Sequence, residues 1–315
     1  MDNIVLTQED CTKADEFLDA ISPIGKNFKE HQLNLSWLFR GQGKDWDLKP
    51  SLFRRDTSSI KKLRSMTRRS FSETYEQLLL VERDFLLAFF SIGDKQGFTI
   101  PDDSQELRST FESVRFNDNY VMNNKAKWIT FGKVLSLAAL AQHHGIPTRL
   151  LDWTLQPLIA AYFAAEGGKN RYDDDKQEFD DVNIPIVVWG FCYPLFGVQT
   201  SLVRDTYAIK GVTAPGASNQ NLKTQQGVFT LVHPDYSNER AGEYLPLGTI
   251  LTNIANGPYS KNVAVCKLQK YTLPVTESFN LLRLLAKLDI APSSIYPGYQ
   301  SIINDIKNEN LWREK

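Results

Sequence analysis

The chain has 315 residues, of which 42% are hydrophobic and 23% are charged, a balance typical of a soluble globular protein. Its formal net charge of −1 excludes a global field that would attract nucleic acid or an anionic membrane. No apolar run approaches the roughly 18 residues that span a bilayer, and the N-terminus lacks the basic and apolar blocks of a signal peptide. We therefore expect a cytoplasmic protein with no membrane partner.

The cysteines favour neither a disulfide framework nor a metal centre. Cys11, Cys192 and Cys266 are isolated in the sequence, odd in number, and none forms a CxxC pair. We therefore expect no metal site.

The length permits one large domain or two small ones.

The first elements are a short helix and a strand. Thr12-x-x-Asp15 resembles a capping box, and the apolar spacing after it predicts a helix that stops before Pro23. Residues 35–42 predict a strand that ends beside Gly41, with Arg40 closing its apolar run. A guanidinium at a strand end is well placed to bind an anion. A surface arginine at a turn is the alternative.

Residues 46–127 contain a basic segment and a predicted long helix. Residues 46–55 predict an extended, buried connector, and residues 61–69 form the most basic segment, either a solvated face or a docking patch for a polyanion. Ser70-x-x-Glu73 resembles a capping box for a long helix. Glu82 lies on the apolar face of that helix and therefore needs a partner. Residues 91–127 lack periodicity and predict an insertion or cover.

The densest group of polar side chains lies at residues 142–154. Apolar residues at helical spacing precede it and Gly145 is placed to stop that helix, while Thr154 is placed to cap a second helix that Gly167-Gly168 ends. We therefore expect a polar connector between two core helices, a common way to build a site. The alternative is a buried corner in which Arg149 pairs with Asp152.

Strands dominate the second half of the chain. Residues 167–181 predict an acidic loop and residues 193–224 a long polar loop. Strands are predicted at residues 184–191, 225–232 (after a turn) and 263–268, and late helices near residues 281–288 and 302–311. Helices cluster before residue 167 and strands mostly after it. This order predicts an α+β fold with a mixed or antiparallel sheet rather than a βαβ repeat.

Three blocks together resemble a known family. They are WLFRGQ (37–42) with LKPSLFR (48–54), AQHHGIPTRLLDWT (141–154), and QQGVFT (225–230). Their combination resembles the FRG domain, over about residues 30–305, which implies a single domain over residues 1–315. The layout of that domain in turn resembles the ADP-ribosyltransferase superfamily. The resemblance implies an ADP-ribosyltransferase-like sheet core with an N-terminal helical portion, and NAD as co-substrate.

The resemblance assigns the blocks to roles. Arg40-Gly41 matches the Arg-Gly that holds NAD, Thr154 matches a hydroxyl motif, and Gln225-Gln226-Gly227 lies where a catalytic glutamate is expected. No glutamate occurs there, and a glutamine supplies no negative charge. Asp152 or Glu82 would then have to stabilise the oxocarbenium-like ribose.

The expected site comprises catalytic and cofactor-binding residues. The catalytic set has a guanidinium on phosphate or ribose, a general base, a carboxylate and an orienting amide: Arg40, His143, Asp152 and Gln226. The cofactor-binding set has phosphate-binding donors, a glycine for close approach and a ring-stacking indole: Arg40, Gly41, Gln42, Arg149, Trp153, Thr154 and Gln225.

The resemblance also implies a biological role. It suggests a bacterial toxin or anti-phage effector that modifies nucleic acid and is restrained by an antitoxin protein. Residues 61–69, with aromatics such as Trp46, Phe71 and Tyr75 nearby, favour RNA over DNA as acceptor. The alternatives are a protein acceptor, a non-catalytic sensor of NAD or a nucleotide, and an interaction scaffold.

Overall fold

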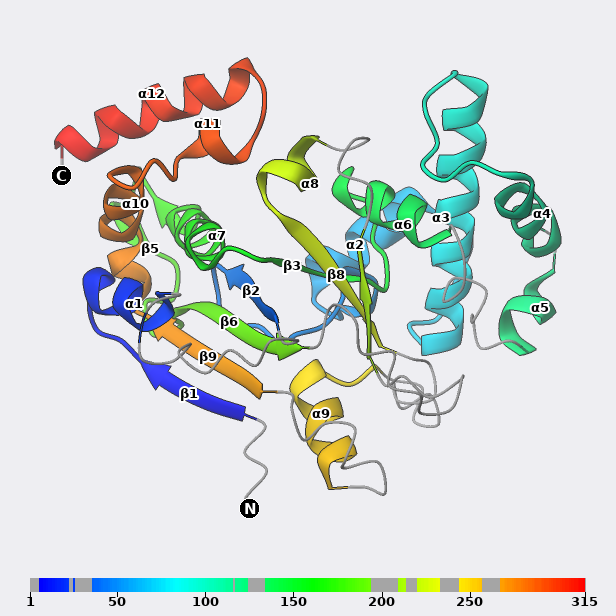
Figure 1. Cartoon of the computed structure of the whole chain (residues 1–315), viewed down its shortest axis with the longest axis horizontal. Coiled ribbons are helices and arrows are strands. Elements are labelled where there is room, and N and C mark those ends of the chain that lie inside the picture. Colours follow the sequence, from blue (N-terminus) through cyan, green and yellow to red (C-terminus); the bar gives the residue numbers. More distant parts are fainter. Residues whose placement is uncertain are drawn as a thin grey trace.

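A computed structural model places the chain around one mixed sheet, with helices on both faces (Figure 1). It describes residues 6–22, 25, 36–115, 117–123, 134–193, 209–213, 220–232, 244–256 and 267–314. The strand order is β1 (Leu6–Asp10), β9 (Lys267–Leu273), β6 (Ile186–Tyr193), β2 (Ser36–Gln42), β3 (Leu151–Thr154), β8 (Gly227–Val232) and β7 (Ile209–Val212). The β1–β9 pair is parallel and the other pairs are antiparallel, which confirms the expected α+β fold with a mixed sheet.

The central strands are apolar on both sides because both faces of the sheet are covered. In β2, Leu38 packs in one core cluster and its neighbour Phe39 in the other. In β6, Val187 packs in the same cluster as Leu38, and its neighbour Val188 packs in the same cluster as Phe39. Successive side chains of a strand point to opposite faces, so a strand buried on both faces reads as a continuous apolar run.

Three helices cover one face of the sheet: α1 (Ala14–Ile21), α7 (Pro157–Lys169) and α10 (Ser278–Ala286), the last following the 3₁₀ turn η8 (Val275–Glu277). The small side chains of α7 let it lie close to β2. A methyl group added at Gly41 would lie 1.8 Å from the backbone oxygen of Ala160, and one added at Gly43 would lie 2.3 Å from the carbonyl carbon of Gly167. Gly41 is therefore required by helix packing.

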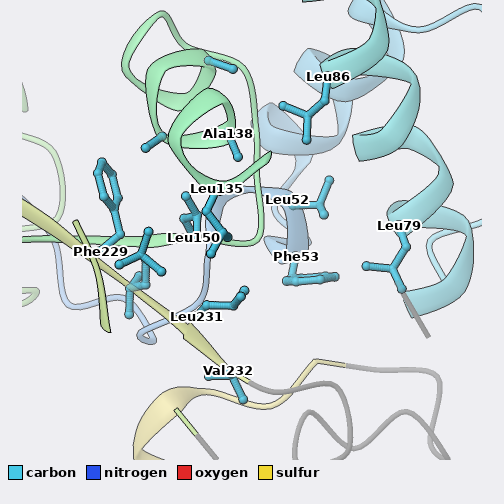
Figure 2. Packing of buried hydrophobic residues seen from close by; sticks show 14 of the residues in the cluster. Leu52, Phe53, Leu79, Leu86, Leu135, Ala138, Leu150, Phe229, Leu231 and Val232 are labelled. Carbon is cyan, nitrogen blue, oxygen red and sulfur yellow. The ribbon is translucent and has the colours of Figure 1, made fainter. Parts of the chain in front are cut away.

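The other face carries α3 (Tyr75–Lys95), α6 (Val134–His143) and the 3₁₀ turn η2 (Ser51–Phe53). Figure 2 shows Leu79 and Leu86 of α3 pointing toward Leu52 and Phe53, with Leu135 of α6 beside Leu150. The Phe53 ring is stacked between two tyrosines, at 5.1 Å from Tyr75 and 4.3 Å from Tyr244. The connector of residues 46–55 is thus buried at its apolar positions, although η2 interrupts its extended course.

Residues 91–127 differ from expectation. We predicted no regular element there, but α3 runs on to Lys95 and is followed by α4 (Gln105–Val114) and α5 (Asp118–Asn123), seen at the right of Figure 1. Phe111 of α4 stacks on Phe90 of α3 at 4.8 Å, so α4 extends the core. The buried residues of α4, Leu107, Phe111 and Val114, do follow the i, i+4, i+7 spacing of a helix, and we overlooked this signal among the many polar residues of the stretch. Residues 116 and 124–127 lie outside the described residues.

Helix starts account for other differences. Residues 61–66 of the basic segment lie in α2 (Thr57–Met66), and residues 67–69 follow it. The helix is capped by Asp56, whose side chain accepts a hydrogen bond from the Ser59 amide. The capping box at residues 70–73 is wrong, because α3 begins at Tyr75 after Thr74. At α1 the N-cap is Lys13, and Glu16 rather than Asp15 accepts from the Thr12 amide.

The polar block of residues 142–154 forms a strand where we expected a connector. Residues 151–154 are β3, which pairs with β8 over its whole length. Thr154 does not cap α7; its N-cap is Gln156, and the helix includes Gly167 and Gly168. Four residues are too short to show a strand period in sequence. The stop of α6 is confirmed, with Gly145 at φ +86°.

The remaining elements are short or peripheral. Residues 167–181 include the hairpin β4 (Tyr172–Asp173) and β5 (Glu178–Phe179). The stretch predicted as a long polar loop contains β7 and α8 (Gln220–Thr224), and most of its other residues lie outside the described ones. We did not predict β1 or α9 (Leu247–Ala255), although Leu247, Ile250 and Leu251 of α9 follow helical spacing. The strand predicted at residues 263–268 begins at Lys267 among the described residues. The expected late helices are confirmed as α10 and, after α11 (Pro292–Ile295), as α12 (Tyr299–Glu314). None of the described helices is long and apolar enough to cross a membrane.

We predict that Gly41→Ala destabilises the protein by about 3 kcal/mol or more, because the new methyl group overlaps the backbone of α7, which cannot yield as a flexible side chain does. Gly190→Ala is the matched control in the adjacent strand: the nearest atoms to its methyl group are at 3.5 Å, an ordinary contact, and we expect a change of less than about 1 kcal/mol. Urea unfolding of both variants measures the difference. Equal stabilities would show that α7 moves away from β2 at little cost.

Candidate functional site

The site lies where two neighbouring strands separate. β2 pairs with β6 over seven residues but with β3 only through Phe39 and Thr154. Continued in register, Arg40 to Gln42 would face Trp153 to Leu151, yet no ladder pairing joins them. A cavity of about 580 Å³ opens at this place. Its charged and polar lining includes Arg40, Gln42, Ser51, Arg54, Lys62, Gln142, His143, Asp152, Thr154 and Gln225.

Arg40 bridges the gap between the two strands. Its Nη1 donates to the backbone oxygen of Asp152 at 2.9 Å, where a neighbouring strand would otherwise donate. The same nitrogen lies 2.5 Å from Oδ1 of the Asp152 carboxylate. The Arg40 side chain is 10% exposed, whereas that of Asp152 is 58% exposed and therefore open to a ligand. The structure thus brings these two expected site residues into direct contact.

Asp152 is charged at neutral pH. Desolvation by neighbouring residues would by itself raise the pKa of its carboxyl, but the charge and hydrogen bond of Arg40 outweigh that effect and hold the pKa below its ordinary value. Gln142 of α6 also donates to Oδ1, at 3.3 Å. Asp152 is the only carboxylate among the described residues that line the cavity.

Two further cations line the same cavity. Arg54 follows η2, and burial together with the charge of Arg40 lowers the pKa of its guanidinium, a direction expected of cations crowded together. Lys62 of α2 is exposed at the cavity. Three cationic side chains and one carboxylate therefore line the cavity. The Nε of Arg40 is buried and has no hydrogen-bond partner among the described residues.

His143 lies at the C-terminal end of α6 and lines the cavity. Burial, and then the nearby charge of His144, lower the pKa of its imidazole. A histidine with a lowered pKa is neutral at pH 7 and can accept a proton. The position of His143 is therefore compatible with the general base expected from the sequence.

The expected ring-binding residue, Trp153, borders the cavity but has a structural role. Its indole is 4% exposed, its Nε1 donates to the Thr230 hydroxyl at 2.9 Å, and its ring packs against Phe191 at 5.5 Å. The Gln42 side chain is also fixed in position, because its Oε1 accepts a hydrogen bond from the Trp189 Nε1 at 3.0 Å. Both residues shape the cavity floor.

Arg149 does not line the cavity. Its backbone amide and its Nε donate to the two oxygens of Glu82 at 2.7 and 2.5 Å, and both side chains are buried. The expectation that Glu82 needs a partner is thus confirmed. Arg149 was expected to bind the cofactor, and the alternative was a buried corner in which it pairs with Asp152; that alternative is wrong, since Arg40 pairs with Asp152. Glu82 and Arg149 instead fix the start of β3 to α3.

The two glutamines of the late motif, Gln225 and Gln226, have different positions relative to the cavity. Gln225 lines the cavity, and its backbone oxygen accepts from the Thr154 hydroxyl at 2.6 Å. Gln226, at φ +46°, is exposed, and its side chain accepts from Gln156 at 3.2 Å. Gln226 is not part of the cavity lining, so the turn that carries it, rather than its amide, shapes the site.

Trp46, Arg54 and Lys62 are among the lining residues that the sequence did not assign to the site. Arg54 lies in the first family block and Lys62 in the basic segment, so each carried a signal, but nothing local showed that η2 and α2 turn them toward β2. Trp46 was considered only as a stacking aromatic for an acceptor. Its side chain is 53% exposed at the cavity.

We predict that Glu82→Gln lowers stability by about 3 kcal/mol, because it leaves the Arg149 guanidinium buried without a counter-charge. Glu106→Gln, at an exposed position in α4, is the control and should change stability by less than about 0.5 kcal/mol. Thermal and urea unfolding measure both. A small effect at Glu82 would mean that water reaches the pair.

A second prediction concerns the pH dependence of the Arg40–Asp152 pair. We expect a double-mutant cycle with Arg40→Met and Asp152→Asn to give a coupling of about 1 kcal/mol at pH 7, modest because Asp152 is more than half exposed. The pKa of Asp152 is depressed in the folded protein, so its contribution is present above the unfolded value of 3.8 and is lost as pH falls through the lower folded pKa. Urea unfolding across this range measures it. A coupling independent of pH would exclude an ionic origin.

Comparison with known proteins shows that part of the chain is similar to a known family. The family model of the FRG domain matches residues 35–173. The comparison with curated proteins found no match, and the comparison with solved structures found none either. The matched stretch runs from β2 to β4 and holds every charged residue described in the cavity lining: Arg40, Arg54, Lys62 and Asp152. The match supports the resemblance to the FRG domain from residue 35 to residue 173, a shorter span than the sequence suggested.

Proposed function

We propose that the cavity binds NAD and that the protein is an NAD-dependent ADP-ribosyltransferase. The observation that carries this proposal is the grouping of three cations and one carboxylate where β2 and β3 separate. A nucleotide with a pyrophosphate next to a ribose that becomes positively charged requires this combination of charges. The volume of about 580 Å³ is in the usual range for a small-molecule site.

The pyrophosphate of NAD would bind to the guanidinium groups. Arg54 supplies one, and Arg40 supplies the buried Nε that has no other described partner. As Arg40 turns toward a phosphate, it withdraws charge from Asp152. The carboxylate then becomes available to the ribose. This order of events reconciles the Arg40–Asp152 ion pair with a catalytic role for Asp152.

The reaction needs one bond broken and one formed. The bond between ribose C1′ and the nicotinamide nitrogen breaks, its electron pair stays on nitrogen, and neutral nicotinamide leaves. Asp152 stabilises the oxocarbenium-like ribose. The acceptor nucleophile bonds to C1′ and gives its proton to His143, which is neutral because burial lowers its pKa. Gln225 and Thr154 hold the cavity wall beside the ribose.

A nucleic acid, RNA in preference to DNA, is the proposed acceptor. The structure separates the basic segment into two groups. Arg69 is paired with Asp84 and Asp118, whereas Lys61, Lys62 and Arg68 are exposed and form no ion pair with a described carboxylate. Lys62 also lines the cavity, so this group leads to the mouth of the site. Such a protein would act as a toxin or anti-phage effector in the cytoplasm, restrained by an antitoxin.

One observation favours a second function, that of an NAD or nucleotide sensor without turnover. Asp152 is neutralised by Arg40 and no other described carboxylate lines the cavity. If a bound ligand leaves the ion pair intact, the site has no free negative charge for the ribose. The same residues would then bind the ligand and report its presence.

Labelled NAD tests these alternatives. We expect Asp152→Asn to bind NAD within about threefold of wild type but to transfer ADP-ribose to RNA at least about a hundredfold more slowly, or roughly 2.7 kcal/mol of transition-state stabilisation. Asn keeps the shape of Asp152 and removes its charge. Calorimetry measures binding, and single-turnover labelling of RNA, DNA and protein mixtures measures transfer.

Asp174→Asn is the matched control, because Asp174 is an exposed aspartate on the β4–β5 hairpin, outside the cavity lining. It should bind and transfer as wild type does. Transfer by Asp152→Asn within about threefold of wild type would remove Asp152 from the chemistry. Label on protein instead of RNA would change the acceptor. NAD binding without label on any acceptor would establish the sensor, and no NAD binding would refute both.

A further inference from the structure

We propose that Trp46 is the ring-binding residue of the cavity, with its indole stacking on a planar ring of the bound nucleotide. This inference rests on the proposed function in taking the ligand to be a nucleotide. It replaces Trp153, whose indole is committed to the core. It also gives the cavity a nonpolar contact that its cations cannot provide.

The first argument is exposure. Trp46 is 53% exposed and lines the cavity. Trp153 and Trp189 lie in β3 and β6, the strands on either side of β2, and are 4% and 8% exposed. An indole left in water forgoes hydrophobic stabilisation of the fold. Tryptophan is at the same time the side chain that contributes most contact area per rotatable bond to a bound ligand.

The second argument is the rigidity of the loop that carries Trp46. On its N-terminal side, the backbone oxygen of Gly43 accepts from Arg171 at 2.8 Å. Asp45 forms an ion pair with Lys270 at 2.6 Å, and that lysine lies over the Trp189 ring. Anchors on two different elements therefore fix the backbone next to Trp46.

Anchoring continues after the indole. The backbone oxygen of Leu48 accepts from the Leu247 amide at 3.1 Å, and the Leu48 side chain is buried. A loop held on both sides of an exposed indole loses little conformational entropy when a ligand stacks on it. A loop whose only task is to connect β2 to η2 would not need an indole held in water.

The third argument is complementarity within the cavity. Arg40, Arg54 and Lys62 favour the phosphates of a nucleotide but give no means to recognise its ring. Trp46 adds a π face, on which adenine stacks and over which a positively charged nicotinamide ring is also attracted. Phosphate and ring contacts together would select a nucleotide over inorganic anions.

The test compares Trp46→Ala and Trp46→Phe by calorimetry with NAD, nicotinamide mononucleotide, AMP and inorganic pyrophosphate. We expect Trp46→Ala to weaken NAD binding about tenfold, the loss of one ring stack. Trp46→Phe should stay within about threefold, and pyrophosphate affinity should change in neither variant. The mononucleotide that loses affinity with Trp46→Ala identifies which ring is stacked.

Fluorescence gives an independent readout. NAD should quench part of the tryptophan emission of wild type, and that part should be missing from Trp46→Phe although this variant still binds. Phe98→Ala is the control, since Phe98 is 70% exposed and does not line the cavity. It should match wild type in affinity and quenching.

The outcomes separate this inference from the proposed function. If wild type binds NAD and Trp46→Ala binds it equally well, the stack is refuted and NAD binding stands. If AMP binds and NAD does not, with the same loss in Trp46→Ala, the stack stands and the transferase proposal fails. The stack is also refuted if Trp46→Ala weakens pyrophosphate binding as much as NAD binding. It is refuted equally if wild type binds nucleotides no more tightly than pyrophosphate. Absence of binding by any ligand overturns both.

Discussion

The separation of β2 from β3 is the constraint on which the site depends. Two adjacent strands that share one pair, Phe39 with Thr154, leave backbone groups facing a gap. A buried carbonyl without a donor is costly, and the Arg40 guanidinium supplies the donor for Asp152 while its charge holds the carboxylate ionised. One side chain therefore closes the sheet and creates the charged floor of the cavity.

Other contacts keep the two strands in this arrangement. Gly41 lets α7 lie against β2, and the Glu82–Arg149 pair ties the start of β3 to α3. These contacts are buried and specific in geometry, so neither strand can easily shift to restore the ladder. Gly41 thus lines the cavity and also permits the packing of α7, whereas Arg149, which does not line the cavity, supports the site through Glu82.

Charge must be considered at the scale of the cavity. The whole chain has a net charge of −1, which argues against attraction of polyanions over long distances. Three cations and one carboxylate line the cavity, and the Arg40 Nε has no described partner. Charges that lie within contact distance of each other are screened less by salt than distant ones. A near-neutral protein can therefore hold a cavity whose lining has an excess of positive charge.

The sequence by itself determined the positions of β2, β6, β8 and α3 and that Glu82 needs a partner, because apolar runs, helical spacing and burial of a charge are local properties. It did not reveal β3, which is only four residues long. It also placed Arg40 and Asp152 in one site through a family resemblance. Only the tertiary structure decided that Arg149 pairs with Glu82 and Arg40 with Asp152, since ion pairs depend on distances between segments far apart in the chain. The same holds for Trp46 and Trp153. Both tryptophans follow an aspartate directly in the sequence, so their local sequence does not distinguish them. Only packing decides that the Trp153 indole is buried and that Trp46 is exposed at the cavity.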